Sequence, residues 1–390
     1  MKQKIRTVIF LAACAVCVSI LWKHTHSVQA PKQAQTGGAQ AAKKETGQTL
    51  EFPAEYKEKV SDKLSFNASV DTGDADLNQI GCRKATIQKF DEKTVKNCFL
   101  DPDVKYDSDT GRESGWEGTD VISKIYNHEG VGFLNFWENG FLYSSPLMDD
   151  IWNLMSASYG DTKTNYKYQF SKDLDLDGFS KQDALKALTE LLGRQGVAAK
   201  QWKAVESYTL DAASMGRQEK NLISDGSIDL NMEQGHGKWR RREEGYYFFI
   251  EECVDGVPLV PARTLANMGN SWSAPTDNYT YITRDGVAGF RLCDWFEAKE
   301  GDGHYKLAPF DDVIQSLKAK YGSQLIDDSV CVEKLKLYLY PISMGKGVYM
   351  LRPVWICRAV FRTPGEDGGT GYESLAALDA VTGAELEELK

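Results

Sequence analysis

Apolar residues recur at helical spacing in two stretches that lie far apart along the chain. Each follows polar or acidic residues, and each ends near a glycine, Gly193 or Gly322. Apolar side chains three or four residues apart line the face of a helix that packs on a core. The first predicted helix opens at Ser180 with apolar positions Ala184, Leu185, Leu188, Leu191 and Leu192; the second opens at Phe310 with Val313, Ile314, Leu317 and Tyr321.

Each predicted helix precedes stretches rich in aromatic and β-branched residues, which are typical of strands. After the first come "WKAVESYTL", "YYFFIEECVDGVPLV" with a tight Asp-Gly turn, and "YTYITRDGVAGF". After the second come residues 330–341, residues 348–361 and "LAALDAVTGAEL". The segments "DGVAG", Asp285 to Gly289, and "DAVTG", Asp379 to Gly383, match. We therefore predict a duplicated α+β unit in which a helix packs on an antiparallel sheet.

The predicted domain boundaries follow from this repeat. The first unit covers residues 171–295 and the second covers residues 296–390. Only the first contains the polar, glycine-rich stretch 211–245, which predicts a long loop. Residues 51–170 have strand patterns in "DKLSFNASV" and "GFLNFWENGFLYSS" and a helix pattern in "DEKTVKNCFL". We predict a separate N-terminal α+β domain there, with a third, diverged copy of the unit as the alternative.

A helix, a meander of strands and a closing "DAVTG" resemble PepSY-type domains. The segments "YLYPI", "YMLRPVWICRAVF" and "ALDAVTGAEL" also resemble exported regulatory proteins of the YycI/YycH type and related Gram-positive lipoproteins. The resemblance covers residues 171–390 and is specific at Pro353, Val354 and Trp355 and at Asp379 to Gly383. It implies a cystatin-like fold outside the membrane and roles in restraining proteases or tuning sensor kinases. It implies no catalytic residues.

The N-terminal thirty residues have the features of a targeting segment. Basic "MKQKIR" precedes an apolar run at residues 8–22, which is short for a membrane span. Three fates compete: lipidation at Cys14 of "LAAC", cleavage after "VQA" at Ala30, and an uncleaved anchor. All three place the remainder outside the cytoplasm, at the cell membrane or secreted. Residues 31–50, rich in Gln, Ala, Gly and Lys, predict a flexible linker.

Charge narrows the class of partner. The chain has 46 Lys and Arg against 56 Asp and Glu, for a formal net charge of −10. The first thirty residues contain four basic residues and no acid, so the exported part is more acidic still. Because an acidic surface repels phosphate backbones, we do not expect nucleic-acid binding.

The segment "DLDLDGFSKQDA", Asp173 to Ala184, resembles a calcium loop at its first six positions. An EF-hand loop also needs ligands at its ninth and twelfth positions, which are Lys181 and Ala184 here. Ser180 and Asp183 fit a capping box that opens the helix instead. We therefore expect no metal site at Asp173, Asp175 and Asp177, and no cofactor.

Six cysteines follow the N-terminal segment, and none forms a CxxC pair. Isolated buried thiols and disulfides both fit an exported protein. A hairpin folded about Met344 and Gly345 would bring Cys331 and Cys357 nearly opposite, within disulfide reach. These two residues are the candidate disulfide.

Familiar catalytic motifs are absent from the sequence. His128, His236 and His304 stand without neighbouring ligand pairs, and adjacent Glu251 and Glu252 would point to opposite faces of a strand. Two hypotheses follow: a membrane-tethered interaction protein that binds another envelope protein, or an extracellular hydrolase whose site converges only in the fold. For the first, the candidate contacts are Trp239, Arg240, Arg241 and Arg242, although a solvated loop also explains this basic cluster.

Overall fold

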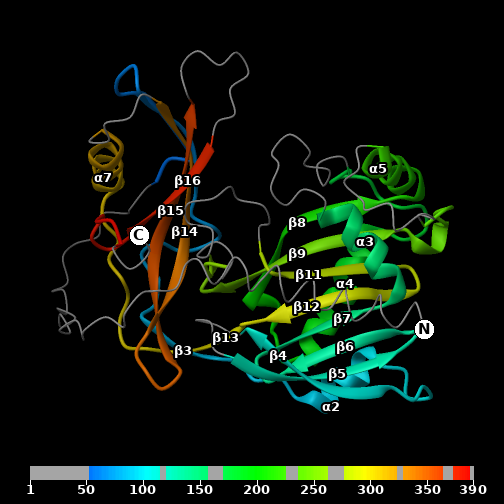
Figure 1. The fold of residues 1–390 in the computed structure, drawn as a ribbon. Helices are drawn as coiled ribbons and strands as arrows, with labels where there is room; N and C mark the ends of the chain where they lie inside the picture. The colour runs from blue at the N-terminus through cyan, green and yellow to red at the C-terminus, as the bar shows by residue number, and fades with distance from the viewer. Residues whose placement is uncertain are drawn as a thin grey trace. The chain divides into compact units, whose positions relative to one another are not determined.

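The computed structural model describes residues 52–114, 120–156, 170–224, 236–261, 276–322, 328–362 and 372–386 (Figure 1). The chain divides into two units, Met1–Gln48 and Thr49–Lys390, and the described residues belong to the second. This unit is α+β. Its strands form one mixed sheet and one antiparallel sheet.

The first sheet has seven strands in the order β1-β2-β14-β15-β3-β13, and β16 also pairs with β15. Strand β2 runs parallel to β14, and the other pairs are antiparallel. The bounds are β1 Glu55–Lys59, β2 Leu64–Asp71, β3 Arg83–Ile87, β13 Phe296–Lys299, β14 Ser329–Ser343, β15 Val348–Arg362 and β16 Tyr372–Asp379.

The second sheet has nine strands in the order β10-β9-β11-β12-β7-β6-β5-β4, and β8 also pairs with β9. All its pairs are antiparallel. The bounds are β4 Asp107–Ser114, β5 Asp120–His128, β6 Gly132–Trp137, β7 Gly140–Ser144, β8 Trp202–Leu210, β9 Gly245–Val254, β10 Val257–Pro258, β11 Asn278–Thr283 and β12 Gly286–Cys293.

Helices cover both faces of the nine-stranded sheet. Strand β9 is buried at all ten positions, and its side chains alternate between two cores. Tyr246 and Phe248 pack with helices α2 (Glu92–Phe99) and α4 (Lys181–Arg194), while Tyr247 packs with α3 (Pro146–Ser156) and α5 (Ala212–Ser224). Because successive side chains of a strand point to opposite faces, one aromatic strand supplies both cores.

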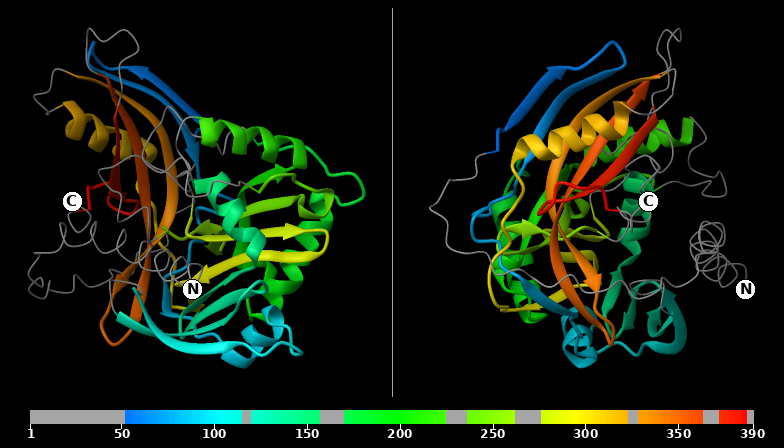
Figure 2. Two further views of the ribbon diagram at one scale, coloured as in Figure 1. Left: turned by 45° about the vertical axis from the view of Figure 1, so that its right-hand side comes forward. Right: turned by 90° about the vertical axis from the view of Figure 1, so that its left-hand side faces the viewer.

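The two helices predicted from apolar spacing are confirmed. Helix α4 begins at the predicted capping box, in which Ser180 and Asp183 exchange hydrogen bonds. Helix α7 (Phe310–Gly322) buries its four predicted apolar residues against one face of the seven-stranded sheet (Figure 2). Gly193 lies inside α4, and Gly196, with φ +82°, adopts the left-handed conformation beyond its end.

Each of these helices precedes a three-stranded antiparallel meander. Strands β8, β9 and β11 follow α4 in this order, with β9 in the middle. Strands β14, β15 and β16 follow α7, with β15 in the middle. The matching segments differ in structure: "DGVAG" begins in the turn after β11 and continues into β12, whereas "DAVTG" begins at the last residue of β16 and continues as a turn.

The prediction of a separate N-terminal domain requires the strands of residues 51–170 to form a sheet of their own. They do not. Strands β1, β2 and β3 join the seven-stranded sheet, and β4 to β7 join the nine-stranded sheet. A strand without a neighbour exposes unpaired backbone groups. In these two sheets, strands from distant parts of the sequence supply hydrogen-bond partners for those groups.

The prediction of a long loop at residues 211–245 is wrong for the described parts of that stretch. Helix α5 begins at Ala212, where Asp211 accepts hydrogen bonds from the backbone of Ala213 and Ser214. Its buried Met215 and Leu222 share a core with Trp239, whose exposure is 6%. The segment therefore contributes to the core.

The predicted disulfide is also wrong. Cys331 lies opposite Val360, Cys357 lies opposite Leu335, and both thiols are free. Residues Ser343 and Tyr349 pair across the turn, so the hairpin folds about Lys346 rather than Met344 and Gly345. A bulge between Val332 and Lys334 shifts the register further.

A buried ion pair joins the two sheets. Lys336 of β14 donates to Glu251 of β9 over 2.8 Å, and both side chains are almost wholly buried. Burial raises the pKa of Glu251, although Lys336 and Lys203 oppose this shift. Next to it, Glu252 accepts a hydrogen bond from the backbone of Phe296, the first residue of β13, and burial raises the pKa of Glu252 well above its usual range.

We predict that Lys336→Met lowers the free energy of unfolding by about 3–5 kcal/mol, because it leaves Glu251 buried without its main partner. The double variant Glu251→Met/Lys336→Met should recover most of this loss, since it removes both charges. Urea unfolding of the single and double variants measures the two effects. A loss below about 1 kcal/mol in the single variant would contradict the assigned role.

Candidate functional site

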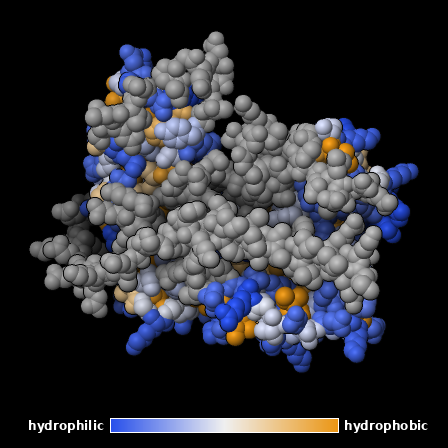
Figure 3. Space-filling model, viewed as in Figure 1, coloured by the Kyte–Doolittle hydropathy of each residue, from blue (hydrophilic) through white to orange (hydrophobic). Residues whose placement is uncertain are grey.

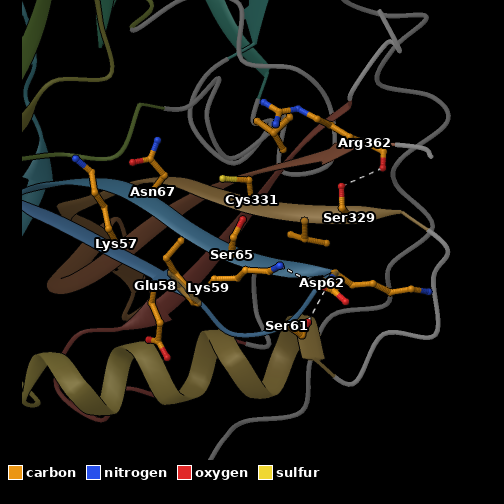
Figure 4. A pocket seen from close by; sticks show the side chains of 14 residues that line it. Lys57, Glu58, Lys59, Ser61, Asp62, Ser65, Asn67, Ser329, Cys331 and Arg362 are labelled. Carbon is orange, nitrogen blue, oxygen red and sulfur yellow. Dashed lines mark hydrogen bonds and ion pairs between the residues drawn. The ribbon is translucent and has the colours of Figure 1, made fainter. Parts of the chain in front are cut away.

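An open groove of about 560 Å³ lies on the seven-stranded sheet, over β1, β2, β14 and β15 (Figure 4). Its lining combines polar and cationic side chains with apolar ones such as Phe66, Val330 and Val360. The residues that line it are Lys57, Glu58, Lys59, Ser61, Asp62, Lys63, Ser65, Phe66, Asn67, Ser329, Val330, Cys331, Val360 and Arg362.

The alternation of side chains along the strands produces the groove. On β2, Leu64, Phe66 and Ala68 are buried in the core that contains α7, so Ser65 and Asn67 point to the other face. Ser65 lies opposite Lys59 on β1 and beside Cys331 on β14. Cys331 in turn lies opposite Val360 on β15. This row places short side chains in the middle of the sheet, where they form a floor.

Long cationic side chains stand around this floor. Lys57 and Lys59 lie on β1 at one side, and Arg362 lies at the end of β15 (Figure 4). Lys57 pairs with Glu55 over 2.7 Å and Lys59 pairs with Asp62 over 2.7 Å. The side chains of the first pair are 65% and 67% exposed. Such exposed pairs contribute little stability, so an anionic ligand can replace their acidic partners.

The groove differs in charge from the chain as a whole. Its lining contains four cationic and two acidic side chains, whereas the chain carries a net charge of −10. One of the two acids, Glu58, bonds to Lys318 of α7 and to Tyr56. The side chain of Glu58 points toward the helix side (Figure 4). Asp62 bonds to Lys59, and two acids outside the lining, Glu55 and Glu333, lie within 2.7 Å of Lys57 and 3.5 Å of Arg362.

Figure 3 shows one face of the molecule, and the described apolar residues do not gather into a large patch on it. The coloured residues on that face are mostly hydrophilic, with small separated apolar spots. Exposed large apolar side chains such as Ile122, Met344 and Leu174 come from different elements.

The predicted contact cluster at residues 239–242 occupies a different position. Trp239 stacks on His236 with ring centroids 3.8 Å apart, and its indole donates to Glu219. Arg241 bonds to Asp177, and Arg240 donates its backbone N–H to Glu243. Because Trp239 is buried, it does not offer the exposed contact that the sequence suggested.

The aspartates of the calcium-like segment have structural partners. Asp175 accepts a hydrogen bond from the backbone of Lys181 at the start of α4. The carboxylate of Asp177 pairs with Arg241, and the backbone carbonyl of Asp177 accepts a hydrogen bond from Arg284, which lies between β11 and β12. Within the described residues, no group of three or more His, Cys, Asp and Glu side chains has an arrangement that holds a metal ion.

His236 lies between two carboxylates. Its Nδ1 is 2.8 Å from Asp150 of α3, and its Nε2 is 3.1 Å from Glu243. Only a protonated imidazole donates from both nitrogens at once. Burial lowers the pKa of His236, but the hydrogen bonds with Asp150 and Glu243 outweigh this effect, and the net shift is upward. The interaction links α3 to the residues that follow α5.

The comparisons with known proteins concern the fold. No protein-family model matches the chain, and no curated protein matches it. An uncharacterized protein from Eubacterium rectale ATCC 33656 has a similar structure, with a TM-score of 0.60 and 16% sequence identity. The match covers 86% of this chain and 94% of that one, so the two share a fold over most of their lengths.

The C-terminal domain of YpeB from Bacillus megaterium also matches, with a TM-score of 0.29 and 11% identity over 76% of this chain and 96% of that one. A score this low does not establish a shared fold. Among the described helices, none is long and apolar enough to cross a membrane. The apolar run at residues 8–22, with Cys14, lies outside the described residues.

We predict that the free energy of unfolding falls as pH rises from 6 to 9, in part through His236. The pKa of His236 is higher in the folded protein than in the unfolded chain, where it is about 6.5. The stabilisation by protonated His236 is therefore complete below the unfolded pKa and is lost as the pH rises through the folded pKa. His236→Asn should reduce the slope of the free energy of unfolding against pH. His304→Asn, at an exposed histidine, is the control. Denaturant unfolding across this pH range measures the slope, and an unchanged slope in His236→Asn would exclude this role.

Proposed function

We propose that the protein is an extracytoplasmic regulatory interaction protein, tethered to the membrane by its N-terminus, whose groove binds another envelope protein. The observation that carries the proposal is the cation-lined groove on an otherwise acidic chain. Electrostatic complementarity of this kind steers association and selects partners. The exposed ion pairs of Lys57 and Lys59 allow an acidic partner to replace the internal acids.

Two further observations support this function. The repeated helix and meander agree with the PepSY-type resemblance, and we propose that they are duplicated cystatin-like units. The basic n-region and apolar run of the first thirty residues support export. The groove begins at Lys57, a few residues after the linker, and its floor requires strands from the other end of the chain.

We predict that the full-length chain fractionates with the membrane and not with the cytoplasm. If Cys14 is lipidated, Cys14→Ser should abolish labelling with a fatty-acid analogue, whereas Cys17→Ser, a matched control in the same apolar run, should leave labelling intact. Recovery of the uncleaved, unlabelled chain in the membrane would assign an anchor instead. Recovery of the full-length chain in the soluble cytoplasm would refute the export proposal.

We also predict that a photo-crosslinker in place of Val360 captures an envelope protein in intact cells. Val360 is partly exposed on the floor of the groove, and a crosslinker at Ile122, 71% exposed on the nine-stranded sheet, is the control. Lys57→Glu/Lys59→Glu should abolish the adduct, because it reverses the charge of one wall. Capture of the same protein at Ile122, or capture that survives the charge reversal, would argue against the groove.

A further inference from the structure

One wall of the groove consists of lysines that recur at every second residue of strand β1. Lys57 and Lys59 are two residues apart on β1, so their side chains leave the same face of the sheet. At about 3.4 Å per residue, their Cα atoms are about 6.8 Å apart. An extended peptide that runs along this wall has the same repeat, because its residues i and i+2 also face one side.

Each lysine has a hydrogen-bonding neighbour across the strand pair. Lys57 lies opposite Asn67, and Lys59 lies opposite Ser65, in antiparallel register. Directly opposite side chains in such a pair are about 4.5–5.5 Å apart at Cβ. Lys57 and Asn67 therefore share one step of the wall, and Lys59 and Ser65 share the next, while the two ammonium groups bond to Glu55 and Asp62. An acidic ligand that replaces these two acids brings each ammonium to the same carboxylate as the neighbouring amide or hydroxyl.

A carboxylate is the ligand that matches each of these steps. It accepts hydrogen bonds at two oxygens, one from the ammonium and one from the amide or hydroxyl, and hydrogen bonds between charged groups are the stronger kind. The floor beyond, with Cys331 and Val360, consists of short side chains that leave room for the peptide backbone. The position of β1 at the end of the strand order leaves this wall at a sheet edge.

We propose that the groove recognises an extended segment of its partner protein in which two acidic residues are separated by one residue. Lys57 with Asn67 forms one carboxylate subsite, and Lys59 with Ser65 forms the other. This inference rests on the proposed function and specifies its ligand. The two acids reach both subsites only when they lie on the same side of the extended peptide.

Three fluorescein-labelled peptides of matched length test the spacing, with the full-length chain in detergent. They are GSSESESSG, GSSEESSSG and GSSQSQSSG. The first should bind about fivefold more tightly than the second at low salt, because adjacent acids point to opposite sides and one exposed charge contact is lost. The third should not bind measurably. Fluorescence anisotropy gives the three dissociation constants.

Variants assign the subsites. Lys57→Gln should bring the first two peptides to equal affinity, whereas Lys200→Gln, at an exposed lysine of the short 3-10 helix that precedes β8, should leave the fivefold difference unchanged. Equal binding of both acidic peptides by the wild-type chain would refute the spacing rule, and it would leave the proposed function intact if crosslinking at Val360 succeeds. Binding to phosphatidylglycerol vesicles without binding to any peptide would refute the inference in favour of lipid headgroups.

Discussion

The architecture depends on one end of strand β9, where Glu251 and Glu252 stand side by side. Adjacent side chains of a strand point in opposite directions, so the two carboxyl groups contact different parts of the seven-stranded sheet. Glu251 accepts hydrogen bonds from Lys336 in β14, and Glu252 accepts one from the backbone at the start of β13. The sequence suggested that these glutamates could not act as a pair; in the structure they have different hydrogen-bond partners, and both line one small cavity of about 30 Å³. Their opposite directions are what connects β9 to two strands of the neighbouring sheet.

A buried carboxyl and a buried ammonium are costly to remove from water, and apolar residues of the same size often serve stability equally well. The advantage of the ion pair is that it aligns strand β14 with strand β9. Apolar contacts such as those of Val254, Val257 and Leu259 tolerate small shifts, whereas the hydrogen bonds of Lys336 require a defined position. A defined position of β14 matters for the groove as well, because Ser329 and Cys331 of the same strand lie in its floor.

The sequence predicted what local spacing determines. The capping box at Ser180, the buried face of α7 and the turn at Asp255 and Gly256, both with positive φ, all follow from residues close together in the chain. The parallel pairing of β2 with β14 joins residues far apart in the chain, and alternation shows only which face a side chain occupies. The division of residues 51–170 between two sheets was therefore not accessible to pattern analysis.

Two features of the site were not predicted from the sequence: the burial of Trp239 and the groove. Trp239 stands in a basic, polar stretch, and composition suggested exposure, yet Met215 and Leu222 seven residues apart on α5 were a local sign of a buried helix face. The groove had a weaker sign, the alternating lysines of "EYKEK", which a solvated edge strand also explains. Lysines on an edge strand guard against unwanted pairing, and here the same two residues border a floor of short side chains. The floor exists only because the last long hairpin of the chain lies beside the first. The ligand binding that we propose for the groove therefore depends on the pairing of β2 with β14.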